Sequence, residues 1–555
     1  MNPCKLLSKI IFILLLLPSF ANSQSWQWAK GNGGTGNDGA SQLAIDPNGN
    51  IYSGVSSMYP TTYFGTDTFT ISGFNDMFLV KYDNNGNKLW INQYGGPNVS
   101  MINIKQDGIS SIIYDSFSNS IISAGVFIES SDFGCTILSS TLEDRQIFLL
   151  KTDLNGNCVW SKQAGSFSDD FSYSSAADGS GNIYLTASVR DSATVDTSQV
   201  ARGGVLAKYD SNGNWLWAKN IFSYTNALGI WGSSIQVGKI IIYSNELYLV
   251  GRNIVDSLTI DTAALQLNNY YGNILAKFDL SGNLIWYKYF AGPTSYYIPT
   301  LSIDISGNCY ITGTFNNGTA IFQTDTIYST GNADMYLVKY DSNGNKIWLN
   351  HASSTLNAYG IGLSADVDGN NYLTGTFSVN ANFGAFNISA NTSFDMYIAR
   401  FNSNGDCLGV RQCDNTSGGA IVSDGSGNAI ICGSFTNTTN FGSVNLSSYG
   451  NMDAFIAKHD IITGIGGDGR IANNQLIIYT NPNAGRCTIK MPDKLLNEKD
   501  LVLTIYDAIG RQIHEFKVSS ADGKINLNLE EESKGIYAVT LGNSKVMYYG
   551  KIVLE

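Results

Sequence analysis

A short cassette recurs six times along this chain and constrains its fold more than any other feature. It consists of an aromatic-rich segment, an Asp-x-x-Gly-Asn turn and a segment that carries a Trp, and its first copy runs from Lys81 to Trp90. Self-similarity at so long a period is typical of an array of equivalent supersecondary units, each of which buries its apolar face against its neighbours. The later copies reach Trp160, Trp217, Trp286, Trp348 and, with the Trp lost, Gly409.

A second turn and strand precede the cassette in most copies. In the first copy this turn spans Asp46 to Asn50 and the strand begins at Ile51. The second and fourth copies keep the strand alone, at residues 121–126 and 247–251. The chain holds seven equivalents of this strand, one more than the number of cassettes, and each carries a small residue: Gly54, Gly125, Ala187, Gly251, Gly313, Gly375 and Gly433.

Each unit therefore offers four strands, which in the first unit are expected at residues 40–46, 51–55, 77–82 and around Trp90. Repeated four-stranded antiparallel units with short turns are the blades of a β-propeller. The seventh unit ends near residues 454–459 and lacks its Trp strand, while an orphan Trp strand stands at residues 25–30. The sequence thus predicts an all-β chain whose body is a seven-bladed β-propeller closed by the N-terminal strand.

The turns and the Trp residues each allow a functional and a structural interpretation. Asp-x-x-Gly-Asn resembles part of a calcium loop, but an EF-hand also needs further carboxylates and a Glu at its twelfth position. We therefore expect the Asp to cap the turn, with Gly and Asn accepting positive φ. The Trp rings could stack on sugars or bases. Their constant place in one strand of each unit instead predicts that they lie between adjacent sheets.

Charge and the N-terminal segment bear on location and partners. The net charge of −12 makes nucleic acid an improbable partner, because phosphate contacts need clustered Lys and Arg. Lys5 and Lys9 precede an apolar run, and small residues follow it up to Ser23, so residues 1–23 are predicted to be a secretory signal peptide. That run is too short to span a bilayer, and no transmembrane segment is expected elsewhere.

Neither the cysteine spacing nor the known catalytic motifs indicate a catalytic site. Seven Cys follow Cys4 without metal-like spacing, and we expect isolated, buried thiols. Cys407 and Cys413 would lie roughly 20 Å apart on one extended strand, too far for a disulfide. The three His are scattered, the Gly-x-Gly-x-x-Gly segments at residues 31–36 and 464–469 are expected to be connectors, and Asp169-Asp170 is expected to be a solvated acid pair. No catalytic residue, cofactor or metal site is predicted.

The composition changes after the repeats. Residues 24–460 form the predicted propeller, residues 461–474 are Gly-rich and predict a flexible linker, and residues 475–555 carry a new alternating pattern. Expected strands there include residues 501–507, 524–529 and 537–541, which fits a small Ig-like β-sandwich.

This tail resembles the type A C-terminal sorting domain of proteins exported by the type IX secretion system of Bacteroidota. The resemblance rests on motifs near its start, middle and end, closing with residues 551–554, although Thr480 stands where Pro is common. It implies recognition by the outer-membrane translocon and sortase machinery, and a secreted or cell-surface location reached through the periplasm. The motif residues are Asn481, Pro482, Asn483, Gly485, Asp507, Gly510, Arg511, Lys534, Gly535, Ile536 and Tyr537.

The body resembles bacterial SBBP-type propeller repeats, a family without a common ligand. Two classes of function follow. The first is a non-catalytic binding or adhesion module for a surface glycan or protein, which the lack of a catalytic constellation favours. The second is a propeller enzyme, either a glycan-active hydrolase or a quinoprotein-like dehydrogenase, because the spacing of Asp83, Gly86 and Trp90 is similar to a tryptophan-docking motif, one residue shorter.

Overall fold

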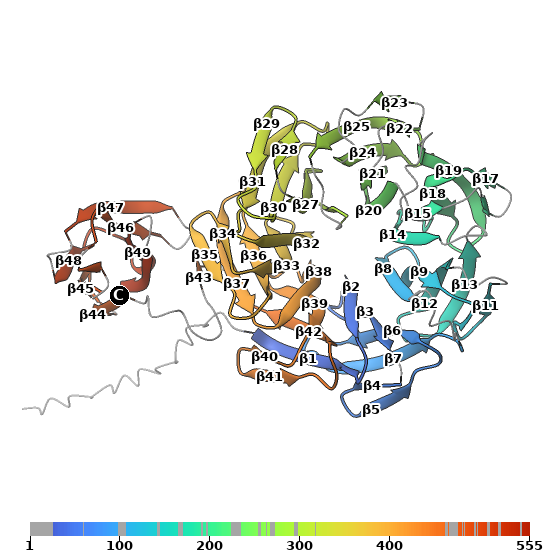
Figure 1. Ribbon diagram of the computed structural model, residues 1–555, viewed down its shortest axis with the longest axis horizontal. Helices are drawn as coiled ribbons and strands as arrows, with labels where there is room; N and C mark the ends of the chain where they lie inside the picture. The colour runs from blue at the N-terminus through green and yellow to red at the C-terminus, as the bar shows by residue number, and fades with distance from the viewer. Residues whose placement is uncertain are drawn as a thin grey trace, which may run out of the picture.

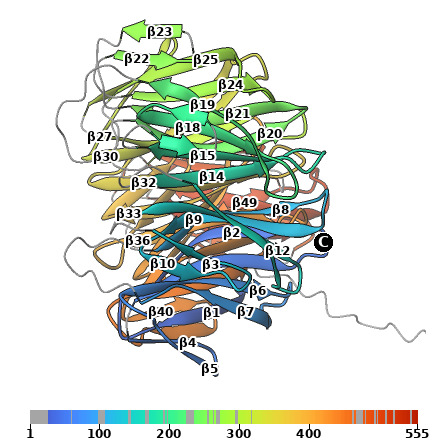
Figure 2. The same cartoon turned by 90° about the vertical axis from the view of Figure 1, so that its right-hand side faces the viewer.

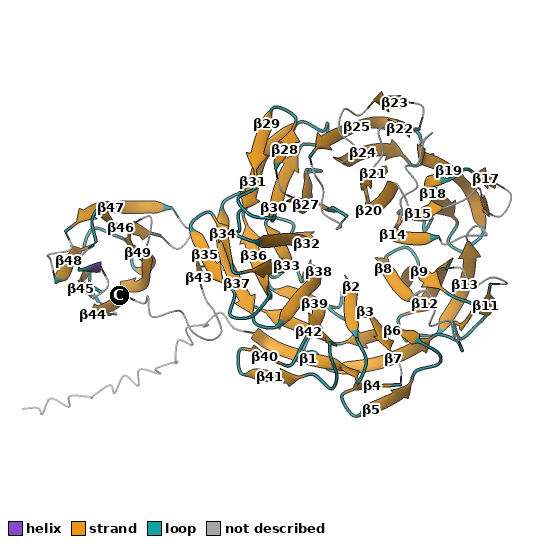
Figure 3. Cartoon of the chain, viewed as in Figure 1, coloured by secondary structure: helices purple, strands orange, loops and turns teal. Residues whose placement is uncertain are grey.

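The computed structural model describes most of the chain from Trp26 onwards, and strands dominate it (Figure 3). The predicted signal peptide, residues 1–23, lies outside the described residues, as does most of the predicted linker. The described ranges are 26–58, 60–97, 107–140, 145–164, 170–189, 193–195, 198–223, 235–253, 257–261, 263–266, 272–292, 298–316, 318–460, 464–465, 476–479, 481, 483–492, 495–496, 498–507, 511–519, 523–543 and 547–554.

The repeats fold into four-stranded antiparallel units, as their pattern predicts. The first unit contains β2 (Gly39–Ile45), β3 (Ile51–Met58), β6 (Asn75–Tyr82) and β7 (Lys88–Tyr94), in that spatial order. The next are β8 (Gly108–Asp115), β9 (Ser120–Phe127), β12 (Gln146–Asp153) and β13 (Cys158–Ala164); β14 (Phe171–Ala177), β15 (Ile183–Val189), β18 (Gly203–Tyr209) and β19 (Trp215–Ser223); and β20 (Ile235–Tyr243), β21 (Glu246–Asn253), β24 (Gly272–Asp279) and β25 (Leu284–Ala291).

The later units repeat this order. They are β26 (Thr300–Ile303), β27 (Cys309–Asn316), β30 (Ala333–Tyr340) and β31 (Lys346–Ala352); β32 (Asn357–Ala365), β33 (Asn371–Ser378), β36 (Asp395–Phe401) and β37 (Cys407–Cys413); and β38 (Thr416–Ser423), β39 (Ala429–Phe435) and β42 (Asp453–His459) with β1 (Trp26–Gly34). The units lie around a common centre with their first strands innermost (Figure 1). Seen from the side, the strands run across the body (Figure 2).

The last unit draws its fourth strand from the other end of the chain. β1 pairs antiparallel with β42, with Trp26 opposite His459 and Lys30 opposite Ile456. This confirms the predicted pairing of these two segments. The orphan Trp strand at the start of the chain thereby covers what would otherwise be an exposed sheet edge.

Each unit also contains an additional hairpin between its second and third strands, which the sequence analysis missed. In the first unit, β4 (Thr61–Phe64) turns into β5 (Asp67–Thr70), and β4 pairs with β1 of the preceding unit. The others are β10 (Ser130–Asp132) with β11 (Ile137–Ser139), β16 (Ala193–Val195) with β17 (Ser198–Val200), β22 (Ser257–Ile260) with β23 (Ala263–Gln266), β28 (Thr319–Phe322) with β29 (Asp325–Tyr328), β34 (Asn380–Phe383) with β35 (Phe386–Ser389), and β40 (Thr438–Phe441) with β41 (Val444–Ser447).

The apolar core lies between units as much as within them. Every residue of β6 is buried, because β3 and β7 flank it and neighbouring sheets cover its faces. Tyr52 and Leu79 of the first unit share one apolar cluster with Phe148 and Leu150 of the second. A single unit would leave such surfaces exposed, so the units are stable only together.

One cysteine pair departs from the prediction. Cys135, in the hairpin turn after β10, forms a disulfide with Cys158 at the start of β13. The expectation of isolated thiols is wrong for this pair, because the unpredicted hairpin brings Cys135 to its own fourth strand. Cys407 and Cys413 are free, as expected, and so are Cys309, Cys432 and Cys487.

The tail forms two antiparallel sheets around a shared apolar core that includes Ile489, Leu503 and Val539. One sheet contains β44 (Ile477–Tyr479), β45 (Arg486–Lys490) and β48 (Lys524–Asn528), and the other contains β46 (Leu501–Tyr506), β47 (Gln512–Val518), β49 (Gly535–Gly542) and β50 (Met547–Leu554). Within the predicted linker, β43 (Gly464–Ile465) pairs with β37, so these two residues are held against the body rather than forming a free connector.

Candidate functional site

The Asp-x-x-Gly-Asn turns use their carboxylates internally. Asp83 Oδ1 accepts the backbone N–H groups of Asn85 and Asn87 at 2.9 and 2.8 Å, and Oδ2 accepts Nδ2 of Asn87 at 2.8 Å. Burial opposes ionisation here, but these hydrogen bonds outweigh it and lower the pKa of Asp83. The same network recurs at Asp46, Asp153, Asp178, Asp210, Asp279, Asp304, Asp341, Asp366 and Asp424. The Asp therefore caps the turn and the turn Gly has positive φ, as predicted. The expectation of positive φ is wrong for the turn Asn, which instead donates its side-chain amide to the Asp carboxylate.

The Trp rings cover the turn glycine of the following unit. Trp28 Nε1 donates to Asn84 O at 3.1 Å, and a Cβ on Gly86 would lie 2.6 Å from Trp28 Cδ2. Gly86 also has a φ of 77°, so the position needs glycine for two independent reasons. The rings of Trp90, Trp160, Trp217, Trp286 and Trp348 make the same contact with Gly156, Gly213, Gly282, Gly344 and Gly405. This confirms their predicted place between sheets, although these five rings are half-buried.

The lost Trp of the sixth copy has a structural explanation. Gly409 stands in its place. The following unit has no Asp-x-x-Gly-Asn turn after its third strand, β42, because its fourth strand is β1 from the other end of the chain. A Trp would have no glycine to cover. Instead, Gly409 lies opposite Gly464 of β43.

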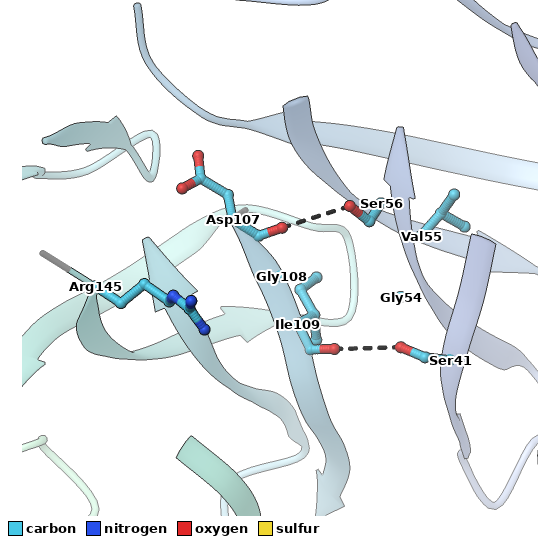
Figure 4. A pocket seen from close by; sticks show the side chains of 8 residues that line it. All are labelled: Ser41, Gly54, Val55, Ser56, Asp107, Gly108, Ile109 and Arg145. Carbon is cyan, nitrogen blue, oxygen red and sulfur yellow. Dashed lines mark hydrogen bonds between the residues drawn. The ribbon is translucent and has the colours of Figure 1, made fainter. Parts of the chain in front are cut away.

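A hollow of about 280 Å³ lies near the inner strands of the first two units (Figure 4). Ser41 of β2, Ser56 of β3 and Asp107 before β8 line it, together with Arg145 before β12. Ser41 Oγ and Ser56 Oγ donate across the junction to the carbonyls of Ile109 and Asp107, each at 3.4 Å. The hollow therefore sits at a seam between two units.

The polar groups of this hollow are held from several sides. Asn75 accepts the N–H of Asp107 at 3.0 Å and donates to its carbonyl at 2.7 Å. Burial raises the pKa of the Asp107 carboxyl well above its ordinary value. Arg145 lies over the ring of Phe171 at 4.5 Å. Hydroxyl, carboxyl and guanidinium groups together can bind a small polar molecule, but His, Cys and Lys are absent from the described lining.

Sequence reasoning did not identify this hollow. Its lining comes from four segments of two units, and their proximity depends on how the sheets pack. One signal was available: Arg145 stands at the repeat position that Asn75 occupies in the first unit.

The three His residues lie apart from one another, each with its own neighbours. His351 lies beside Asp334, His459 lies in β42, and His514 contacts Glu532 in the tail. Burial lowers the pKa of His459 to about 4, so it is neutral at physiological pH. Asp169 lies outside the described residues. Asp170 is fully buried, which corrects the expectation of a solvated acid pair.

Gly31 to Gly34 of the first Gly-x-Gly-x-x-Gly segment lie in β1, against the last unit, and two residues of the second, Gly464 and Ile465, form β43. Among the described residues of these two segments there is no strand-to-helix turn of the kind that a dinucleotide site needs.

The predicted sorting motif joins the two ends of the tail. Asn481 Nδ2 donates to Lys551 O at 2.6 Å, and its Oδ1 accepts the N–H of Val553 at 2.8 Å. Asn483 pairs with the same closing strand and accepts the N–H of Gly485, whose φ is 105°. Pro482 and Gly510 lie outside the described residues.

The middle and late motifs are also held by local contacts. Asp507 accepts the N–H of Arg511 at 2.9 Å and forms an ion pair with its guanidinium at 3.0 Å. Tyr537 is buried and donates to Ser533 O, whereas Lys534, Gly535 and Ile536 are exposed. The exposed residues are thus available at the surface of the tail.

Comparison with known proteins agrees with part of this picture. Residues 477–555 match the family model of the secretion system C-terminal sorting domain, which confirms the resemblance of the tail. Such a tail indicates export to the cell surface or the extracellular space, and interaction with the secretion machinery. In the described residues, no helix has the length and apolarity needed to cross a membrane.

The body has weaker similarities. A stretch of 387 residues is 24% identical to an uncharacterised WD repeat-containing protein of Acanthamoeba polyphaga mimivirus, covering 58% of this chain and 28% of that relative. Among solved structures, the extracellular domain of a putative one-component system from B. thetaiotaomicron matches with a TM-score of 0.18 and 10% identity over 93% of this chain and 86% of that one. A mutant apocarotenoid oxygenase of Synechocystis gives 0.28 and 7% over 79% and 95%. At these TM-scores the structural matches carry no argument.

Proposed function

We propose that the body is a seven-bladed β-propeller of SBBP type, closed by its N-terminal strand, which acts as a non-catalytic binding or adhesion module at the surface of a bacterium of the Bacteroidota. A signal peptide would bring the chain to the periplasm, and the type IX system would carry it across the outer membrane. The main observation behind a non-catalytic role is what the repeated Asp and Trp side chains contact. They cap turns and cover the next unit, so they serve assembly rather than a reaction.

Support for the location comes from the sorting domain at residues 477–555. Support for the binding role comes from the arrangement of units around a centre, which presents many loops on a rigid scaffold (Figure 1). The WD repeat-containing relative is consistent with a repeat scaffold of this kind.

A binding screen tests the function directly. The mature chain, residues 24–555, would be applied to a glycan array and to surface-protein and matrix panels, and turnover of each bound glycan would be followed by chromatography. We expect saturable binding without turnover. Turnover of a bound glycan, or a quinone absorption band in the purified protein, would identify an enzyme instead.

Export is tested separately. Removal of residues 472–555 should leave the body folded in the periplasm of a type IX-competent cell, and the same residues fused behind a signal peptide and a reporter should bring the reporter to the surface or the medium. Normal surface delivery of the tailless chain would contradict the assignment.

A further inference from the structure

A groove of about 680 Å³ separates the first two units on the side of their outer strands. Residues 91–94 of β7, with Gly95 after it, form one wall. The other wall is formed by residues 132–134 of the β10–β11 hairpin and by residues 156–158 of the following turn and strand. This volume lies within the roughly 300–1,000 Å³ of typical ligand sites.

The hairpin that borders the groove does not extend the preceding sheet, and β16–β17, β34–β35 and β40–β41 likewise form separate two-stranded sheets. At three other junctions the hairpin adds strands to the preceding sheet, with β4 on β1, β22 on β19 and β28 on β25. Here a single bridge joins Asp132 of β10 to Gly95, the residue after β7, and the rings of Phe133 and Tyr94 stack with their centroids 5.5 Å apart. The Cys135–Cys158 disulfide ties the hairpin to its own unit. The disulfide, the bridge and the ring contact therefore fix this wall beside β7.

The groove presents hydrogen-bond acceptors. Asn92 Nδ2 donates to Gly156 O and to Tyr94 Oη, and Gln93 Nε2 donates to Thr70 O and to Asp76 Oδ2. The amide donors are thus used internally, while no donor from the described residues reaches the amide oxygens of Asn92 and Gln93. Asp132 receives the N–H of Gly134 on one carboxylate oxygen, and its side chain is exposed.

The charges in the groove restrict the ligand. The described lining residues of the groove include two carboxylates, Asp76 and Asp132, but no Lys, Arg or His. This negative charge disfavours anionic ligands. Asp76 is fully buried, so Asp132 is the exposed charge, and one carboxylate is a weak attraction for a polycation. Uncharged acceptors beside one carboxylate suit the hydroxyl groups of a sugar.

We propose that this groove binds a neutral oligosaccharide through the donor groups of its hydroxyls. The inference rests on the proposed binding function and assigns that function a site and a ligand class. Asn92 and Asp132 accept hydrogen bonds from the sugar, and the disulfide-bonded hairpin maintains the distance between the walls.

Calorimetry on the mature chain tests this proposal with cellotetraose, mannotetraose, xylotetraose and laminaritetraose, and with tetragalacturonate and pentalysine as charged probes. We expect at least one neutral tetrasaccharide to bind, and Asn92→Ala and Asp132→Asn each to weaken it roughly tenfold. The matched control is Asn350→Ala. Asn350 donates to Gly405 O at the equivalent place in another unit, as Asn92 does to Gly156 O, but it does not line the groove.

The control separates binding from folding, because Asn92→Ala and Asn350→Ala remove the same structural hydrogen bond and should lower Tm equally. Equal affinity in these two variants would overturn the proposal, as would pentalysine binding that depends on Asp132. Absence of neutral-sugar binding, with binding to another ligand in the broad screen, would overturn the groove assignment alone. A chain that binds nothing in either assay would overturn the proposed function as well.

Discussion

The junction that closes the body and an interior junction use the same contacts but differ in how they are joined. Trp28 covers Gly86 across the closing junction, between the last unit and the first, and Trp348 covers Gly405 between the fifth and sixth units. At the interior junction the Trp strand, β31, follows its neighbour β30 directly in the chain. At the closing junction β1 is held to β42 by hydrogen bonds and packing alone. Non-covalent contacts alone must therefore hold β1 to β42, whereas a short turn also connects β30 to β31.

The two units also differ electrostatically at one repeated position. Asp334 and Asp453 both stand near the start of a third strand and are buried. Asp334 Oδ1 and Oδ2 receive the N–H groups of Ser354 and Thr330, and burial is outweighed by the His351 contact and these bonds, which lower its pKa. Asp453 Oδ2 receives the N–H of Tyr449 at 2.8 Å, but no partner for Oδ1 is found among the described residues. Burial, together with the nearby charge of Asp38, raises the pKa of Asp453 to about 6. At the same position of the repeat, the pKa of Asp334 is therefore lowered and the pKa of Asp453 is raised.

The largest expected effect comes from removing the closing strand. Deletion of residues 24–31 would expose the edge of β42 and the apolar surface that Trp26 and Trp28 cover, and we expect loss of cooperative unfolding of the body. Thermal denaturation followed by near-ultraviolet circular dichroism measures this. An unchanged melting temperature would show that β1 is dispensable.

Replacement of the repeated Trp residues sharpens the comparison. Trp28→Ala should cost about 3–5 kcal/mol, because its ring is 8% exposed and its loss leaves a cavity. Trp348→Ala should cost less, since that ring is half-buried. Urea unfolding of both variants measures the difference, and equal losses would mean that the closing junction is packed no more tightly than the interior one.

The paired Asp residues should respond in opposite directions. A folded-state pKa of about 6 against an ordinary value of 3.8 means that ionised Asp453 destabilises the fold above that pKa. Asp453→Asn should therefore stabilise the protein by about 1–2 kcal/mol at neutral pH, and the gain should vanish as the pH falls towards 4. Asp334→Asn should destabilise it at neutral pH, because a lowered pKa contributes stability that is lost only in acid. Tm measured against pH checks both, and changes of the same sign would refute the assignment.

The smallest effect is expected at the hairpin ion pairs. Lys88 contacts Asp67 at 2.7 Å, and Lys346 contacts Asp325 at 2.6 Å, at equivalent positions beside the closing junction and in the fifth unit. Both Asp partners are about half exposed. Lys88→Ala and Lys346→Ala should each leave stability almost unchanged, because exposed ion pairs are screened by solvent. A clearly larger loss for Lys88→Ala in urea unfolding would show that charge contributes specifically to closure.

The main strands could be predicted from sequence because burial there is periodic and extensive. The third strand of each of the first five units is an apolar and aromatic segment next to an Asp turn, and β6 and β30 are buried at every residue. The closing pair could also be predicted, because a missing strand at one end and an orphan strand at the other are complementary. The tail was predictable from motifs that the structure joins through Asn481 and Val553.

The hairpins and the two hollows could not be predicted in the same way. β10 and β11 have three residues each, which is too short for a clear alternation. A recurring signal was present: a Phe followed by a residue with positive φ, as in Phe64-Gly65 and Phe383-Gly384. The Cys135–Cys158 disulfide and the groove behind it depend on that hairpin. Arg145 and Ser41 meet in one hollow through the packing of two units, which no local pattern encodes.

The position of β42 determines how the body would bear a mechanical load. A force that pulled on the tail would act first on β43, whose two residues pair with β37, and then on the end of β42 at His459. β42 lies between β39 and β1, so a pulled strand has hydrogen-bonded partners on both sides. Without β1 it would be an edge strand that can be peeled away. The N-terminal strand would therefore reinforce the body at the point where a force on the tail would act.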